Sequence, residues 1–209
     1  QGEQEMKLVV GLGNPGREYE QTRHNIGWEI VTEVARRHVT GRAKIQFEGE
    51  LAEMTIDDCR ILLLLPHTFM NASGRSVRKA CDYYDISPAE ILVVCDDFQL
   101  PLRQLRMRAG GSSGGQKGLE DIILRIGTED FSRLRFGIGS PPPRWDAADY
   151  VLGRFSKDER VEVEQALVVA ADAVSDWVRH DIDYCMNHYN LVDNYFLPHL
   201  SSILEYEYP

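Results

Sequence analysis

The segment MKLVVGLGNPG, residues 6–16, starts with a short apolar run that ends in glycines. An apolar run of this length, rich in branched residues and bounded by glycine, predicts a buried β-strand. Residues 25–38 follow with apolar side chains at Ile26, Ile30 and Val34, which is the spacing of one helix face. A buried strand followed by an amphipathic helix predicts an α/β arrangement.

The rest of the chain continues this alternation. The expected strands cover residues 44–48, 51–56, 60–65, 91–95, 103–109 and 134–139, and the further helices cover 72–84, 116–127 and 157–180. Asp57-Asp58 would turn one strand back along the next as a hairpin, and the polar strand 103–109 is expected at a sheet edge. The pattern predicts a single-domain α/β protein, a three-layer sandwich with a mixed, twisted, mostly parallel sheet flanked by helices.

The domain is expected to span residues 6–190. Residues 1–5 (QGEQE) are predicted to be a tag or a disordered lead-in, and residues 191–209 a C-terminal tail of unknown order. No apolar run approaches the ~20 residues that span a bilayer, and the first residues lack the pattern of a signal peptide. We therefore expect a cytoplasmic protein with no membrane association.

The charge is unevenly distributed along the chain. The 23 Lys and Arg against 33 Asp and Glu give a formal net charge of −10, which argues against bulk electrostatic binding of nucleic acid. Residues 103–135 differ, because they carry seven basic and four acidic groups. They either present a local positive face or are scattered solvated charges.

The cysteines and histidines show none of the spacings that metal sites use. The four cysteines form no C-x-x-C pair, and the six histidines form no H-E-x-x-H or H-x-H pattern. We expect reduced, mostly buried thiols and no metal site.

Two glycine clusters invite a nucleotide-binding interpretation. GLGNPG at residues 11–16 matches G-x-G-x-x-G, but Pro15 removes a backbone donor, and Arg36 and Arg37 stand where an acidic residue is expected. A nicotinamide-dependent oxidoreductase is therefore disfavoured, and the turn is expected to aim Asn14 outward from a strand end. GGSSGGQKG at residues 110–118 resembles a P-loop, in which a glycine precedes the lysine and a serine or threonine follows it. Here Gln116 precedes Lys117 and Gly118 follows it, so the motif is incomplete. It is either a backbone-exposing loop before a helix N-terminus or a flexible turn.

Four polar residues stand at or near predicted strand ends and helix starts: Asn14, His24, Asn71 and Asp96. In an open α/β sheet such ends converge on one crevice. A histidine, a carboxylate that orients it and two amides that hold a carbonyl group form a hydrolytic set. No G-x-S-x-G motif or reactive cysteine is evident, so direct activation of water is expected.

Five segments in order resemble the bacterial peptidyl-tRNA hydrolase family over residues 6–185. They are GLGNPGREYEQTRHNIGW, PHTFMNASGRSV, ILVVCDDFQLP, GGSSGGQKGLEDII and FSRLRFGIGSP. The resemblance implies an enzyme without metal or cofactor that hydrolyses the ester between a peptide, or an N-blocked aminoacyl group, and the terminal ribose of tRNA. It would recycle peptidyl-tRNA released from ribosomes, contacting the acceptor stem and 3′ end, and we expect it to be a monomer.

The resemblance also implies roles for individual residues. His24 would be the general base and Asp96 its partner, Asn14 would distinguish N-blocked from free aminoacyl groups, and Asn71 would lie near the water and the substrate carbonyl. The remaining matches are Tyr19 and Phe69 as tRNA-contacting aromatics, Met70 as a pocket wall, and Arg108 and Arg135 as grips on tRNA phosphates.

The chain departs from the family at one loop, where G-G-H-N-G is replaced by Gly114-Gly115-Gln116-Lys117-Gly118. Gln116 and Lys117 are expected among the substrate-binding residues. The outcomes are a compensated site, a lysine that binds the 3′ phosphates, or weakened catalysis, and we favour the first two together. An alternative is a non-catalytic scaffold like the family's relative in chloroplast intron splicing. The net charge of −10 makes this alternative relevant. The presence of Asn14, His24, Asn71 and Asp96 and the basic segment 103–135 argue against it.

Overall fold

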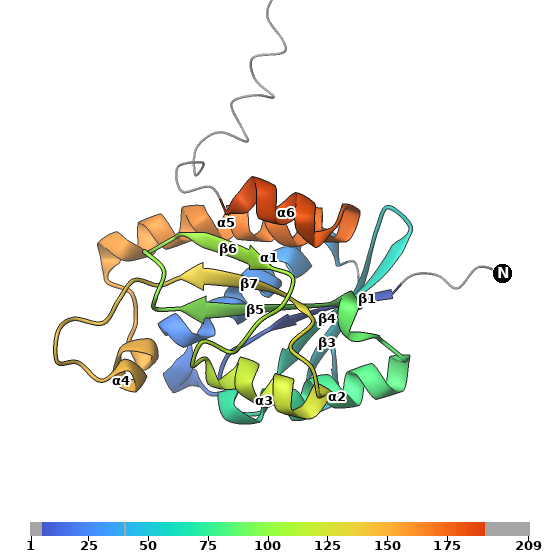
Figure 1. Cartoon of the computed structure of the whole chain (residues 1–209), viewed down its shortest axis with the longest axis horizontal. Coiled ribbons are helices and arrows are strands. Elements are labelled where there is room, and N and C mark those ends of the chain that lie inside the picture. Colours follow the sequence, from blue (N-terminus) through green and yellow to red (C-terminus); the bar gives the residue numbers. More distant parts are fainter. Residues whose placement is uncertain (1–5, 40, 191–209) are drawn as a thin grey trace, which may run out of the picture.

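The computed structural model describes residues 6–39 and 41–190 and has a seven-stranded sheet at its centre (Figure 1). Its order is β2-β3-β4-β1-β5-β7-β6. The four central strands β4, β1, β5 and β7 are parallel, and the antiparallel pairings lie toward the two edges. The strands are β1 (Met6–Gly11), β2 (Lys44–Gln46), β3 (Gly49–Ile56), β4 (Cys59–Pro66), β5 (Ile91–Asp97), β6 (Leu105–Arg108) and β7 (Ser132–Gly137).

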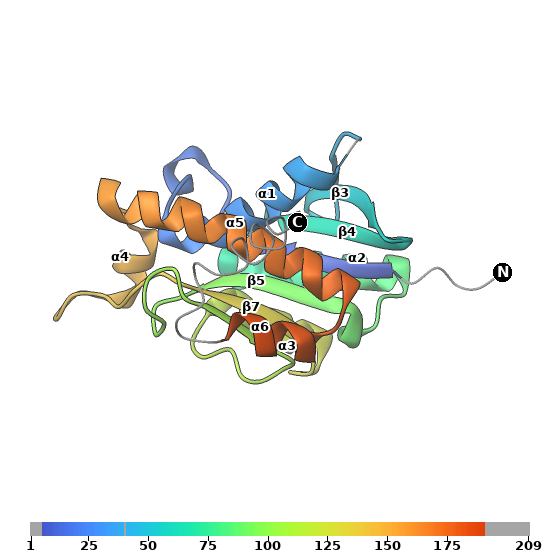
Figure 2. The same cartoon turned by 90° about the horizontal axis from the view of Figure 1, so that it is seen from above.

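Helices cover both faces of this sheet and complete three layers. Helices α1, α5 and α6 lie on one face and α2 and α3 on the other, and Figure 2 shows α5 running over the strands. The helices are α1 (Ile26–His38), α2 (Ser73–Tyr84), α3 (Lys117–Ile126), α4 (Ala147–Leu152), α5 (Lys157–Arg179) and α6 (Ile182–Tyr189). Short 3₁₀ turns form at Arg17–Tyr19, Arg23–Asn25, Met70–Ala72 and Pro88–Glu90.

Two hydrophobic cores explain why the central strands are continuous apolar runs. Along β1, Val9 faces the core under α1 and α5, whereas Leu8 and Val10 face the core under α2 and α3. Successive strand residues point to opposite faces, so a strand covered on both sides needs apolar residues at every position. The predicted α/β sandwich with a mixed sheet is confirmed.

Local predictions also agree with the structure at one sheet edge and one turn. Strand β6 is an edge strand, as its polar pattern predicts. Asp57 and Asp58 have φ values of 46° and 69° in the β3–β4 hairpin, and such left-handed pairs are typical of tight two-residue hairpins.

The sequence pattern predicts neither α4 nor α6. Helix α4 has six residues, too few to show a period, and α6 contains Asp, Tyr, Cys, Asn and His, which form helices weakly. Packing on β6 and the Asp181 cap, which accepts from Tyr184 N at 2.7 Å, stabilise α6 instead.

No helix in the described ranges is long and apolar enough to cross a membrane. The predictions for residues 1–5 and 191–209 lie outside the described residues.

Candidate active site

The polar residues singled out above gather at the carboxyl ends of the parallel strands. Asn14 follows β1, the turn Met70–Ala72 follows β4, and Asp96 stands near the end of β5. Parallel neighbours end at the same sheet edge, and their following loops therefore meet there. His24 joins them from the 3₁₀ turn Arg23–Asn25, which leads into α1.

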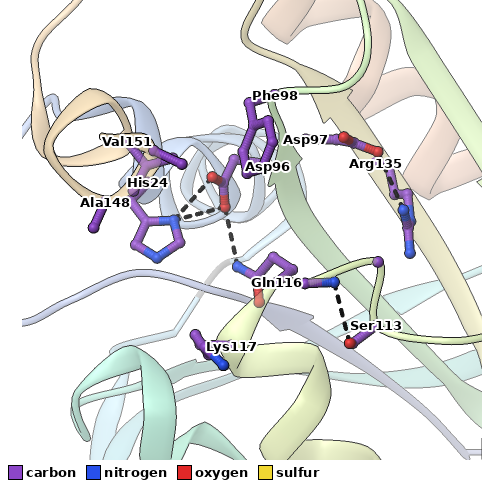
Figure 3. A pocket seen from close by; sticks show the side chains of 13 residues that line it. His24, Asp96, Asp97, Phe98, Ser113, Gln116, Lys117, Arg135, Ala148 and Val151 are labelled. Carbon is purple, nitrogen blue, oxygen red and sulfur yellow. Dashed lines mark hydrogen bonds and ion pairs between the residues drawn. The ribbon is translucent and has the colours of Figure 1, made fainter. Parts of the chain in front are cut away.

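His24 and Asp96 form a close pair. Nδ1 of His24 lies 2.9 Å from both carboxylate oxygens of Asp96, and the two side chains are 12% and 2% exposed. Figure 3 shows the second ring nitrogen pointing away from the carboxylate. When Nδ1–H donates to Asp96, the neutral ring carries its free lone pair on Nε2. The geometry therefore presents a base with a defined tautomer.

The pair also controls the charge of the imidazole. Burial lowers the pKa of His24, but the charge and the hydrogen bond of Asp96 outweigh it and raise the net pKa above its ordinary value. A raised pKa makes the neutral imidazole a stronger base, which is suited to accept a proton and return it during one turnover.

Arg23 fixes the turn that carries His24. Its backbone N–H donates to Gly153 O at 2.9 Å, and its guanidinium group lies 4.5 Å from the Tyr150 ring and 4.7 Å from the Phe155 ring. The same group bonds Glu159 at 3.1 Å. The base is thus tied to α4, which forms a wall of the pocket. Adjacency to His24 is the only trace of this role in the sequence.

Asn14 is held by two reciprocal bonds with Asn25. Asn14 N–H donates to Asn25 Oδ1, and Asn25 Nδ2 donates to Asn14 O, both at 2.9 Å. Asn14 Oδ1 also accepts from Met70 N at 2.7 Å. The side chain of Asn14 therefore extends from the strand end to the Met70–Ala72 turn, which covers it and leaves it 7% exposed. Within the described residues, its Nδ2 donates to no partner and remains available.

Asn71 and two aromatic rings lie at the surface beside this network. Asn71 is exposed in the Met70–Ala72 turn. Phe69 is 57% exposed, and its ring meets that of Tyr19 edge-on, with centroids 6.2 Å apart. An exposed ring next to a polar site offers a stacking surface.

His24 and Asp96 open into a pocket of about 270 Å³ (Figure 3). Phe98, Ala148 and Val151 form part of an apolar wall. The other wall comes from β7 and the glycine-rich loop, with Ser113, Gly114, Gly115, Gln116, Lys117 and Arg135. The pocket joins predicted residues from four separate segments, whereas Asn14, Met70 and Asn71 lie outside its lining. Met70 contacts the lining residue Gln116, and the backbone N–H of Met70 bonds Asn14.

The glycine-rich loop leads into α3, as one of the two predicted alternatives requires. Gly111, Gly114 and Gly115 have φ values of 121°, 59° and 86°, which side-chain-bearing residues rarely adopt. Arg133 donates to the carbonyl oxygens of Gly111 and Ser112, and Arg135 Nη2 donates to Ser112 O at 2.9 Å. The loop is therefore held by two arginine side chains that bind its carbonyl oxygens.

The two residues that depart from the family pattern, Gln116 and Lys117, point their side chains to different sides. Lys117 is exposed, and its Nζ donates to Glu120 Oε2 at 2.8 Å. Gln116 turns inward, where its Nε2 donates to Asp96 Oδ1 at 3.0 Å.

Four arginines share one face of the β6–β7 pair. Arg106 lies opposite Arg135 and Arg108 opposite Arg133, and residues two apart on a strand point to the same side. Arg135 pairs with Asp97 at 3.2 Å. Arg133 is buried, and its hydrogen bonds to described residues all go to backbone carbonyl oxygens. Arg106 and Arg108 form no ion pair with a described residue. A local positive face is favoured over scattered charges, although Arg108 lies outside the pocket lining.

The cysteines offer no alternative nucleophile. Burial raises the pKa of Cys81 and of Cys185 to about 12 and raises that of Cys95 well above its usual range. Cys59 is half-buried at the start of β4, away from the pocket lining. In the described part of the chain, no group of three or more His, Cys, Asp or Glu could hold a metal ion.

Known proteins match this chain over most of its length. Residues 8–195 match the family described as Peptidyl-tRNA hydrolase. A peptidyl-tRNA hydrolase of Rhodopirellula baltica is 52% identical over 185 residues, which cover 88% of this chain and 97% of that protein. One from Chloroflexus aurantiacus is 46% identical over 186 residues, with coverages of 88% and 99%. The crystal structure of peptidyl-tRNA hydrolase from Acinetobacter baumannii superposes with a TM-score of 0.83 at 36% identity, covering 91% and 97% of the two chains.

Proposed function

This chain belongs to the peptidyl-tRNA hydrolase family, and we propose that it hydrolyses peptidyl-tRNA with a water molecule that His24 activates. The bond cleaved is the ester between the acyl group and the terminal ribose. One observation carries the proposal: His24 Nδ1 lies 2.9 Å from both Asp96 oxygens at the wall of a pocket. The family match does not favour the scaffold alternative.

The reaction needs one base and one carboxylate. His24 Nε2 takes a proton from water, and the oxygen of that water attacks the ester carbonyl carbon. Asp96 stabilises the imidazolium that forms and keeps the ring in place. The tetrahedral intermediate then expels the ribose oxygen, which takes up the proton from His24. The products are a free peptide carboxyl group and a tRNA with a free hydroxyl group.

We assign the two asparagine amides to the acyl group. The available group of Asn14 is an N–H donor, which pairs with the carbonyl oxygen of an N-blocked acyl group but not with a protonated amine. Asn14 therefore favours peptidyl-tRNA over aminoacyl-tRNA. Asn71 is proposed to steady the water or the developing oxyanion, a contribution of about 2.7–4 kcal/mol in comparable sites.

The tRNA end is proposed to lie across the rest of this edge. Phe69 and Tyr19 supply rings on which a terminal base can stack. Arg108, Arg135 and Lys117 supply positive charge for phosphates, in keeping with the arginine face of β6–β7. From the family resemblance we further propose that the enzyme works as a monomer in the cytoplasm and that His24 activates the water without a metal ion.

The test is release of N-acetylated and of free aminoacyl groups from tRNA by wild type and by Lys117→Asn. We expect wild type to cleave the N-acetylated substrate and to spare the free aminoacyl one. Equal cleavage of both substrates would remove the assignment of Asn14. Absence of cleavage by wild type, rescued in Lys117→Asn, would show that the altered loop has weakened catalysis.

A further inference from the structure

The side chain of Gln116 connects three parts of the site. It caps α3, because its Oε1 accepts from Leu119 N at 2.9 Å. Its Nε2 donates to Asp96 Oδ1 at 3.0 Å and lies 3.2 Å from Met70 Sδ. A single amide thus contacts the start of α3, the partner of the base, and the turn that covers Asn14.

The orientation of this amide has one chemical solution. Leu119 N is a donor and needs the carbonyl oxygen, whereas Asp96 is an acceptor and needs the NH₂ group. A flipped amide would place an oxygen against a carboxylate. Close packing restrains the rotamer, since a Cβ at Gly118 would lie 2.6 Å from Met70 Sδ and 3.0 Å from Gln116 Oε1.

Gln116 and His24 share one oxygen of Asp96. Oδ1 lies 2.9 Å from His24 Nδ1 and 3.0 Å from Gln116 Nε2. A second donor satisfies part of the carboxylate charge and fixes the plane of the carboxyl group. Less of that charge then holds the proton on His24. An amide does not ionise, so this influence is constant across the working pH range.

Building on the proposed function, we propose that Gln116 is a positioning residue that orients Asp96 and moderates how strongly it holds His24 in the protonated form. Its contacts are directed at Asp96, Leu119 and Met70. At this position the chain therefore compensates for its departure from the family loop by contacting the partner of the catalytic base, Asp96, and not by contacting the tRNA.

Other charged groups near His24 are engaged elsewhere. Asp97 pairs with Arg135 at 3.2 Å, and Lys117 pairs with Glu120 at 2.8 Å. Helix α4 contributes only the apolar Ala147, Ala148 and Val151 to the pocket lining. The guanidinium group of neighbouring Arg23 bonds Glu159. Asp96 is therefore the charged group in direct contact with the ring, and its charge and hydrogen bond act against burial in setting the ring's basicity.

Two substitutions separate capping from contact with Asp96. Gln116→Ser keeps a good helix-capping residue but is too short to reach Asp96. Gln116→Glu keeps the length and the oxygen that caps Leu119 N but replaces the donor by a second carboxylate oxygen. Asp181→Ala is the matched control, because it removes the cap of α6 on the opposite face of the sheet from α3 (Figure 1).

The primary readout is the pKa of the His24 imidazole, measured by NMR titration of each protein. We expect the pKa to rise by about one unit in Gln116→Ser and further in Gln116→Glu, and to stay unchanged in Asp181→Ala. In the hydrolysis of N-acetylaminoacyl-tRNA, the acid limb of kcat/KM should move to higher pH by the same amount, with KM unchanged.

Several results would overturn the inference. An unchanged His24 pKa in a folded variant would show that the contact with Asp96 has no influence. A raised KM with an unmoved acid limb would assign Gln116 to substrate binding. The titration needs no turnover, so it decides the role of Gln116 even if wild type fails to hydrolyse peptidyl-tRNA, a result that would instead defeat the proposed function.

Discussion

Gly27 tests how closely α1 must approach the sheet for His24 to reach Asp96. A Cβ on Gly27 would lie 2.4 Å from Val94 O and 2.7 Å from Leu12 N and O, where ordinary contact begins at 3.4 Å. All three are backbone atoms, of Val94 within β5 and of Leu12 directly after β1, and cannot swing aside. Gly27→Ala therefore pushes the start of α1 away from the sheet by about 1 Å.

The expected effect on stability opposes the usual trend. Replacing an exposed glycine within a helix by alanine usually raises the free energy of unfolding by about 1 kcal/mol. Overpacking typically costs about 1–3 kcal/mol, and here rigid backbone is on the other side of the contact. We expect a net loss of about 1–2 kcal/mol, which lowers the melting temperature by about 2–8 °C for a chain of this size.

The effect on activity is expected to be larger. Gly27 lies three residues after His24, and a shift of about 1 Å would stretch the 2.9 Å bond between His24 and Asp96 beyond normal length. Misplacement on this scale can reduce turnover by about 10²-fold. Exposed Gly41, whose Cβ would meet nothing within 4 Å, provides the control Gly41→Ala. A Gly27→Ala protein as stable and as active as wild type would refute the argument.

Two further substitutions test the surroundings of the site. Arg23→Met should lower the free energy of unfolding in urea by about 2 kcal/mol, because it removes the cation between Tyr150 and Phe155 and leaves Glu159 unpaired. Burial raises the pKa of Glu159, but the hydrogen bonds from Ser156 and the hydrogen bond and charge of Arg23 outweigh it and lower the net pKa below its ordinary value. The stability difference from wild type should therefore be full at neutral pH and shrink as the pH falls through the acidic range in which Glu159 protonates. A difference that is constant with pH contradicts this origin. Arg108→Gln should weaken tRNA binding and reduce the slope of log affinity against log salt by about one, whereas an unchanged slope would remove Arg108 from the phosphate contacts.

The fold is largely predictable because each core element carries its own pattern. The central strands are buried on both faces, so segments such as Leu8–Val10 and Ile91–Val94 appear as unbroken apolar runs. The Asp57-Asp58 turn is visible because these residues tolerate left-handed backbone. Helices α4 and α6 are missed because tertiary packing and caps, not local propensity, define them.

The site is predictable only in its strand-end residues. His24 and Asp96 are recognisable because their residue types and positions suit one crevice. Arg23 is not, since its partner Glu159 lies 136 positions away. Arg133 lies in a charged segment whose composition is compatible with full exposure to solvent, yet its side chain is buried against carbonyl oxygens of the glycine-rich loop. The inward turn of Gln116 depends on a helix start and a strand end that meet only in the folded chain.

Single-turnover hydrolysis of N-acetylaminoacyl-tRNA by His24→Ala tests the central claim most directly, with tRNA affinity measured on the same preparation. Loss of the base should slow the chemical step by about 10²–10⁴-fold, while the dissociation constant for tRNA stays at the wild-type value. Hydrolysis at the wild-type rate by a folded His24→Ala protein would contradict the claim that this imidazole activates the water.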